Sequence, residues 1–212
     1  MVLEKGRWVS ERLLGPVAKR CKGFSPHSFS IAALVCALAA GYFFYISHRC
    51  YEFLFVGALF VFLNGLLDAL DGCVAKHQGK GSRRGDLLDH AIDRYADFAI
   101  LTGLVLSPYI THILIGLLAL MGVFMTSYMG TQAQAVGAAR DYSGVLGRAD
   151  RLVLLIAIPA ITGALVHLHA PYQLTLPWLG TLTLLDIMML WFAVAGNLTA
   201  LHRGARAWRS LP

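Results

Sequence analysis

The stretch Asp68-Ala-Leu-Asp71-Gly72-Cys-Val-Ala75-Lys76, continued by Gly85-Asp86-Leu-Leu-Asp89-His-Ala-Ile-Asp93, ends one long apolar run of the chain and begins the next. Half of the 12 acidic residues lie between positions 68 and 97. A carboxylate beside a hydrocarbon layer is costly unless a cation neutralises it. Such a cluster in an apolar chain therefore indicates a functional site.

The composition around this stretch is that of a membrane protein. The 212 residues are 57% hydrophobic and 14% charged, and the mean hydropathy is +0.62. A helix needs about 20 apolar residues to cross the hydrocarbon layer. Runs of that kind occupy 27–47, 52–71, 87–107, 109–130, 151–169 and 177–201. We expect an all-α integral membrane protein with a single domain over 1–212, in which six transmembrane helices fill 26–212.

The basic residues predict the orientation of these helices. If the N-terminus lies inside, all 18 Lys and Arg residues except Arg49 fall on one side of the membrane. Lys and Arg stay cytoplasmic, so both termini and the acidic stretch are expected at the cytosolic face of the plasma membrane. The net charge of +6 would then face anionic headgroups or anionic substrates. A nucleic-acid partner is not expected, because no basic stripe with interleaved aromatics occurs.

The segment before the first run has an amphipathic pattern. Apolar residues alternate with basic ones at helical spacing over 3–22, which is typical of a helix in the membrane interface, and we place that helix within 1–25. Pro26 suits the first turn of the first spanning helix. The free N–H groups of that turn favour an anion, although an ordinary helix start explains the pattern equally well.

The acidic residues recur at helical spacing on both sides of a polar turn. One face carries Asn64, Asp68 and Asp71, and the next helix carries Asp89, Asp93 and Asp97 on one face. A helical hairpin would bring the carboxylates of Asp68, Asp71, Asp89 and Asp93 together. The alternative is a solvated loop whose aspartates pair with nearby basic residues, but such a loop has no need to keep carboxylates on helical faces.

Four close carboxylates fit a divalent-metal site for a phosphate-bearing substrate. Hard divalent cations prefer carboxylate oxygens, and two of them, Mg²⁺ or Mn²⁺, can clamp a diphosphate. Gly72 and Gly85 would let a ligand approach the backbone closely.

The pattern Asp-x2-Asp-Gly-x2-Ala-Lys-x8-Gly-x3-Asp-x3-Asp resembles the signature of the CDP-alcohol phosphotransferase family, which has Arg where this chain has Lys76. The resemblance covers nearly the whole chain. It implies a six-helix membrane domain with a juxtamembrane N-terminal helix, usually a homodimer. It also implies a metal-dependent enzyme in which an alcohol displaces CMP from a CDP-linked lipid.

The resemblance also implies roles for individual residues. Asp68, Asp71 and Asp89 would hold the divalent ions, and Asp93 would complete the site and deprotonate the attacking alcohol. The residues expected around the CDP-lipid are Pro26, His27, Ser28, Phe29, Gly72, Ala75, Lys76, Ser82 and Gly85. Lys76 keeps the charge of the family arginine but lacks its bidentate fork.

The second polar segment concerns the acceptor. Ser127-Tyr128, Gly147-Arg148-Ala-Asp150-Arg151 and the tail ending at Arg203 resemble the branch of the family that uses inositol phosphate, and most of all the archaetidylinositol phosphate synthases. The resemblance implies that Arg151 and Arg203, with help from Arg140, grip the acceptor phosphate. The donor would be CDP-archaeol and the product archaetidylinositol phosphate. Arg148 belongs to the same group, since all four arginines lie at expected cytoplasmic helix ends, where they could converge on the acidic hairpin. Positive-inside anchoring remains the alternative for each arginine.

Two further alternatives are open. The same chemistry could use glycerol phosphate or serine as acceptor, or CDP-diacylglycerol as donor. A divalent-cation transporter would also place carboxylates in a membrane, but its path should carry polar groups through the whole bilayer. Here only Asp97 and Asp186 are expected to lie deeper, with Asp186 near the middle of the last run. We interpret Asp186 and Asn64 as helix-to-helix contacts, and His90 as lying off the Asp89/Asp93 face.

Overall fold

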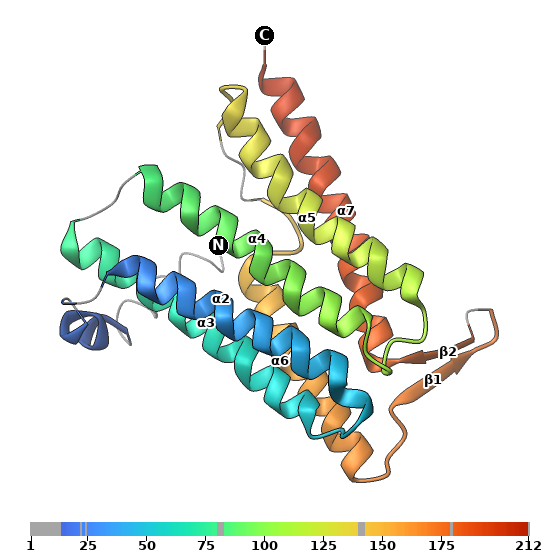
Figure 1. Cartoon of the computed structure of the whole chain (residues 1–212). Coiled ribbons are helices and arrows are strands. Elements are labelled where there is room, and N and C mark those ends of the chain that lie inside the picture. The colour runs from blue at the N-terminus through green and yellow to red at the C-terminus, as the bar shows by residue number, and fades with distance from the viewer. Residues whose placement is uncertain are drawn as a thin grey trace.

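The computed structural model describes residues 14–21, 23, 25–79, 83–139, 143–178 and 180–211. Within them the main elements are α2 (Pro26–Tyr45), the 3₁₀ turn η1 (Ile46–His48), α3 (Phe53–Gln78), α4 (Arg83–Val105), α5 (Ile113–Ala135), α6 (Arg148–His167), β1 (Gln173–Leu176), β2 (Gly180–Thr183) and α7 (Leu184–Ser210). Figure 1 shows a bundle of helices with a small hairpin projecting at one end. Residues 14–20 are also helical, whereas most of the expected interfacial helix lies outside the described residues.

Five of these helices, within the described part of the chain, are long and apolar enough to cross a membrane. They are α2 continued through η1, α3, α5, α6 and α7. The run 87–107 forms a helix as expected, but α4 does not meet the same standard, because Asp89, Asp93, Arg94 and Asp97 lie along it. Length and composition therefore support five spans, and not the six that were predicted.

The fold is mostly helical, as expected, but the described residues also include a short pair of strands that the sequence did not predict. β1 and β2 form an antiparallel hairpin in which Leu174 pairs with Leu182 and Leu176 with Gly180. Gly180 has a φ of 73°, a value that favours glycine at a turn. The alternation of Leu and Thr carries no charge and has the hydropathy of an apolar run, so the predicted last span, 177–201, included part of it. The helix α7 starts only at Leu184.

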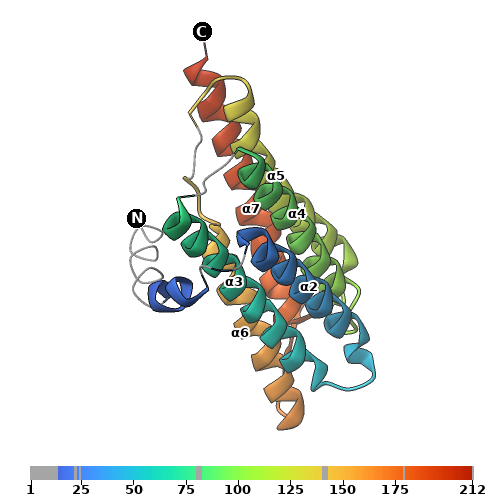
Figure 2. The same ribbon diagram turned by 60° about the vertical axis from the view of Figure 1, so that its left-hand side comes forward.

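The helices are arranged in two groups. α5 and α7 lie side by side over most of their length in both Figure 1 and Figure 2, and they extend beyond the other helices toward the C-terminus. α2 packs against both α3 and α4, and α6 packs against α3. One continuous core joins these helices, and its largest fully buried side chains include Phe44, Phe192, Leu104 and Met189.

Glycines let the helix backbones approach one another. A Cβ added at Gly103 of α4 would lie 2.1 Å from the carbonyl oxygen of Gly41 in α2, and one at Gly41 would lie 2.2 Å from the oxygen of Ala99. Gly122 and Gly196 make the corresponding approach between α5 and α7. Small residues at such crossings permit close packing in membranes.

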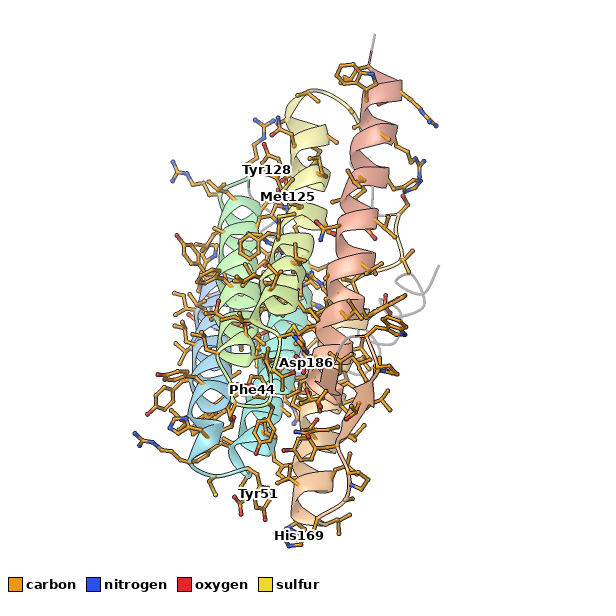
Figure 3. All side chains as sticks on the ribbon, turned by 90° about the vertical axis from the view of Figure 1, so that its right-hand side faces the viewer. Phe44, Tyr51, Met125, Tyr128, His169 and Asp186 are labelled. Atoms are coloured by element: carbon orange, nitrogen blue, oxygen red, sulfur yellow. The ribbon has the colours of Figure 1, made fainter. Side chains whose placement is uncertain are left out.

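Asp186 lies in the first turn of α7, and not near the middle of a span as predicted. Its side chain is fully buried, and Oδ2 accepts hydrogen bonds from the Thr111 hydroxyl at 2.6 Å and the Thr183 N–H at 3.0 Å. Oδ1 accepts from the Thr111 N–H at 3.1 Å. Asp186 is a structural contact and not a ligand, but it joins a helix to a connection and not to another helix: it caps α7 and accepts hydrogen bonds from Thr111 between α4 and α5. Figure 3 shows Asp186 near the start of α7.

We expect Gly103→Ala to destabilise the protein by about 1–3 kcal/mol, because the added methyl group meets backbone that cannot move aside. The apparent melting temperature in detergent should fall accordingly. Gly15→Ala is the control, since a Cβ there meets no atom within 4 Å. Equal melting temperatures for the two variants would show that α2 and α4 can separate freely.

Candidate functional site

The aspartates of the opening stretch lie on α3 and α4. α3 continues past Asp68 and Asp71 to Gln78, so Gly72, Ala75 and Lys76 are helical and not part of a loop. Gly79 ends the helix with a left-handed conformation at φ 63°. Asp71 lies close enough to Asp68 and Asp89 for their charges to act on it. The predicted helical hairpin thus brings carboxylates from both helices together.

Ser30 connects α2 to this cluster. Its buried hydroxyl donates to Asp71 Oδ2 at 2.5 Å, so the early part of α2 lies against the acidic end of α3. Asn64 lies one helical turn before Asp68 on α3, and its Nδ2 donates a hydrogen bond to the Ala33 carbonyl oxygen at 2.9 Å. Asn64 is therefore a contact between α3 and α2, as expected, and the candidate metal ligands of this face are the aspartates.

Arg148, the first residue of α6, joins the carboxylates of the two helices. Its Nη2 lies 3.0 Å from Asp68 Oδ1 and 2.6 Å from Asp93 Oδ1. α4 and α6 pack little against each other directly, whereas α3 packs against both α2 and α6. The guanidinium therefore supplies a link between α4 and α6 that the helix backbones do not make.

Asp93 is the most enclosed of the four predicted ligands. Its side chain is 8% exposed, and among the described residues its Oδ1 has no partner with hydrogen-bond geometry. The contact with Arg148 is thus an ion pair only, and Oδ2 is 3.8 Å from Arg94. A buried carboxylate oxygen of this kind can accept a further ligand, so Asp93 fits a site for a hard divalent cation.

His90 was not expected at this site, and that interpretation was wrong. One ligand atom each from Asp89, His90 and Asp93 lie within 4.8 Å of one another. The His90 Nε2 also lies 3.5 Å from Asp86 Oδ1. The signal was in the spacing, because residues three and four apart are neighbours on a helix, and His90 is three before Asp93 and four after Asp86.

The residues expected around the nucleotide come from the start of α2, the end of α3 and the start of α4. Pro26 begins α2, His27 and Ser28 are exposed, and Phe29 packs against a small apolar cluster that includes Leu70 and Val74. A Cβ at Gly72 would meet nothing within 4 Å, which leaves room for a ligand. Lys76 is exposed in the last turn of α3, Gly85 is half-buried, and Ser82 lies outside the described residues.

The predicted acceptor arginines have separate surroundings. Arg151 is buried, and its Nη1 lies 3.3 Å from Asp97 Oδ2, while its Nε has no hydrogen-bond partner among the described residues. Arg203 donates to the carbonyl oxygens of Ser143 and Thr126, both at 2.8 Å. Arg140 lies outside the described residues. Arg148, which was not among the predicted phosphate ligands, contacts both Asp68 and Asp93.

Comparison with known sequences gives consistent matches. The family model for CDP-alcohol phosphatidyltransferase matches residues 24–199. The archaetidylinositol phosphate synthase of Methanothermobacter thermautotrophicus is 29% identical over 211 residues, which cover 99% of this chain and 96% of that protein. The phosphatidylinositol phosphate synthase of Mycolicibacterium smegmatis is 31% identical over 201 residues, covering 91% and 82% of the two chains.

Solved structures show the same fold. The crystal structure of Mycobacterium tuberculosis phosphatidylinositol phosphate synthase with CDP-DAG bound matches with a TM-score of 0.73 and 27% identity, over 93% of this chain and 94% of that one. The same enzyme in complex with manganese and citrate also gives a TM-score of 0.73, at 26% identity over 92% and 88% of the chains.

Proposed function

The chain belongs to the CDP-alcohol phosphatidyltransferase family, and from this premise we propose that it transfers the phospholipid moiety of a CDP-linked lipid to a hydroxyl of myo-inositol phosphate, releasing CMP. The observation that carries the proposal is the meeting of aspartates from α3 and α4 around the buried Asp93 Oδ1. That arrangement suits a diphosphate substrate, because close carboxylates repel one another unless cations neutralise them, and divalent cations held by carboxylates also bind a diphosphate.

The residues that would hold divalent cations are Asp68, Asp71, Asp89 and Asp93. Two ions of Mg²⁺ or Mn²⁺ bound there would neutralise the charge of the diphosphate and orient it for in-line attack. Asp93 accepts the proton of the attacking inositol hydroxyl. The hydroxyl oxygen then forms a bond to the β-phosphorus of the CDP-lipid, the bond from that phosphorus to the bridging oxygen breaks, and CMP leaves with the electron pair.

The donor would lie against α2 and the end of α3. Ser30 places the start of α2 beside Asp71, and the open face of Gly72 allows a phosphate to approach the helix. The residues that we assign to CDP-lipid binding are Pro26, His27, Ser28, Phe29, Gly72, Ala75, Lys76, Ser82 and Gly85. Relatives named for archaetidylinositol and for phosphatidylinositol both match, so CDP-archaeol is our choice of donor and CDP-diacylglycerol the alternative.

The acceptor phosphate would be held by Arg140, Arg151 and Arg203. The support for Arg151 is its buried Nε, which has a proton to donate and no partner among the described residues. Arginine suits a phosphate because its planar fork donates two parallel hydrogen bonds. The relatives' names make inositol phosphate the first choice, with glycerol phosphate and serine as alternative acceptors.

The membrane arrangement is part of the same proposal. α4 would be the sixth span, with its charges turned toward partners inside the bundle: Arg148 for Asp93, and Arg151 for Asp97. The segment 1–25 would lie in the interface, and both termini and the site would face the cytoplasm of the plasma membrane. A homodimer is proposed from family membership alone. A divalent-cation transporter is the rival, and metal uptake by liposomes without CDP-lipid turnover would favour it.

We expect Asp93→Asn to lower the rate of CMP release by about 100-fold or more, because the amide cannot take the hydroxyl proton. The assay combines purified protein, Mg²⁺ or Mn²⁺, each CDP-lipid and a panel of inositol phosphate, free inositol, glycerol phosphate and serine. Chelation of the metal should stop turnover in the wild type. The control is Glu52→Gln, the same chemical change at an exposed residue far from the site. Full activity in Asp93→Asn would refute this mechanism.

We expect Arg203→Ala to raise the KM for inositol phosphate by about tenfold or more, since a charged hydrogen bond is worth about 1.5–3 kcal/mol. The KM for the CDP-lipid should stay unchanged. Arg209→Ala removes an exposed arginine of the same helix and is the matched control. An equal rise in both KM values would instead indicate that Arg203 only holds the Ser143 segment in place.

A further inference from the structure

The Arg148 guanidinium contacts two carboxylate oxygens that a bound cation needs. Its Nη2 donates to Asp68 Oδ1 at 3.0 Å and lies 2.6 Å from Asp93 Oδ1, so one nitrogen lies between α3 and α4. Oxygen ligands lie about 2.0–2.2 Å from Mg²⁺ or a similar hard ion. A metal ion bound to both oxygens and the guanidinium cannot share this space.

The two contacts differ in kind. The contact with Asp68 has hydrogen-bond geometry, whereas Asp93 Oδ1 has none with any described residue. The attraction to Asp93 is therefore one of charge, which a cation of higher charge can replace, and the one directed bond that displacement of Arg148 breaks among the described residues is the hydrogen bond to Asp68. The Arg148 side chain is also 32% exposed, so it has space to move away from the carboxylates.

We propose that Arg148 is an internal competitor of the metal, a cation of the protein itself that occupies the oxygens of Asp68 and Asp93 and that metal binding displaces. The inference rests on the metal site of the proposed function and adds a positioning role for a residue to which no role in binding was assigned there. It explains how several close carboxylates stay together: a buried charge that lacks a partner is strongly destabilising, and Arg148 provides one.

The test uses Mn²⁺ alone, with binding measured by calorimetry or by the electron paramagnetic resonance signal of the free ion. Arg148→Gln should bind Mn²⁺ about tenfold or more tightly than the wild type, because no ion pair has to break. Arg84→Gln removes an exposed positive charge from the start of α4 without touching these carboxylates, and should stay within about twofold of the wild type. Unchanged or weaker binding by Arg148→Gln would overturn the proposal.

A measurement on the wild type covers the case in which Arg148→Gln does not fold. Phenylglyoxal modifies accessible arginines, and mass spectrometry reports the extent at each one. Modification of Arg148 should increase when Mn²⁺ is added, while that of Arg84 stays constant. No increase at Arg148 in protein that binds Mn²⁺ refutes the competition alone. If the wild type binds no Mn²⁺ at all, the metal site of the proposed function fails as well.

A second, independent feature is the hairpin formed by β1 and β2. Its base is fixed to the connection between α4 and α5, because Thr111 donates to the Thr181 carbonyl at 3.0 Å and Thr183 donates to the Tyr109 carbonyl at 2.6 Å. Figure 1 shows it projecting sideways from the helices. β2 leads directly into α7, and α6 runs from Arg148 toward β1, so the hairpin lies at the end of the bundle opposite the carboxylates.

The hairpin has two unlike faces. Leu174, Leu176 and Leu182 share one face, since Leu174 pairs with Leu182. The other face carries Thr175 and Thr181, whose hydroxyls are 3.3 Å apart. Trp178, at the turn, is 95% exposed and Leu174 is 51% exposed. The sequence 170–183 contains no charged residue.

The geometry points to the headgroup layer of the surrounding lipid as the partner of this hairpin. A fixed element that projects sideways from a spanning bundle lies above lipid. Leu182 is buried at 2% exposed, so the leucines available to the acyl chains are Leu174 and the half-buried Leu176, while Thr175 on the other face is exposed. Tryptophan and tyrosine are enriched at this depth, and Tyr109 and Tyr172 contact each other beside the hairpin base with ring centroids 6.1 Å apart.

Fluorescence quenching tests this placement. The Trp178-only variant carries Trp8→Phe, Trp191→Phe and Trp208→Phe, and the control keeps only Trp191, which is 46% exposed along α7. In phosphatidylcholine vesicles, a spin label at the headgroup should quench Trp178 most, and a label deep in the acyl chains should quench Trp191 most. Iodide on both sides should quench Trp178 weakly. Strong quenching by iodide, or none by any lipid label because a second copy or another protein covers it, would overturn the proposal.

Discussion

Carboxylates at one end of an apolar bundle repel one another, and the surrounding helices are arranged so that this repulsion is offset. Asp68 and Asp71 come from α3, and Asp89 and Asp93 from α4. α2 contributes the hydroxyl of Ser30, and α6 contributes the guanidinium of Arg148. No single helix could neutralise the cluster. Helix packing and site electrostatics therefore depend on each other, since a shift of any of these helices leaves a carboxylate without its partner.

The close backbone approach of α2 and α4 at Gly41 and Gly103 is part of the same requirement. This approach packs one face of α4 against the apolar helix α2. The aspartates of α4 can then contact the arginines of α6. At the other end, Asp186 fixes the connection between α4 and α5 to the start of α7. α4 is thus held by ion pairs of its aspartates near one end and by the hydrogen bonds of Thr111, in the connection that follows it, at the other. This is how a helix too polar to qualify as a span by composition stays in the bundle.

The sequence predicted those parts of the site that follow from spacing along one helix. The aspartate faces are of this kind, because residues three and four apart must be neighbours on a helix, and the structure confirms their meeting. The hairpin was missed because an uncharged run of Leu and Thr has the hydropathy of a span, and only pairing between strands distinguishes it. Arg148 was expected among four arginines that could converge on the acidic hairpin, but its particular partners, Asp68 and Asp93, could not be predicted. Positive-inside anchoring explained every arginine equally well, and nothing in the spacing of α6 shows which carboxylate of another helix lies opposite.

The arginines of α6 and the aspartates of α4 form matching pairs. Arg148 and Arg151 are three residues apart and face Asp93 and Asp97, which are four apart. One turn of each helix separates the pairs, so they lie one above the other. Because α4 and α6 pack little directly, these pairs are what couples them. A cation that takes Asp93 from Arg148 leaves Arg151 with Asp97 as the remaining ion pair between the two helices in the described part of the chain. An anion bound at the Arg151 Nε would then compete with Asp97 for Arg151. It would weaken the remaining ion pair between α4 and α6 in the described part of the chain.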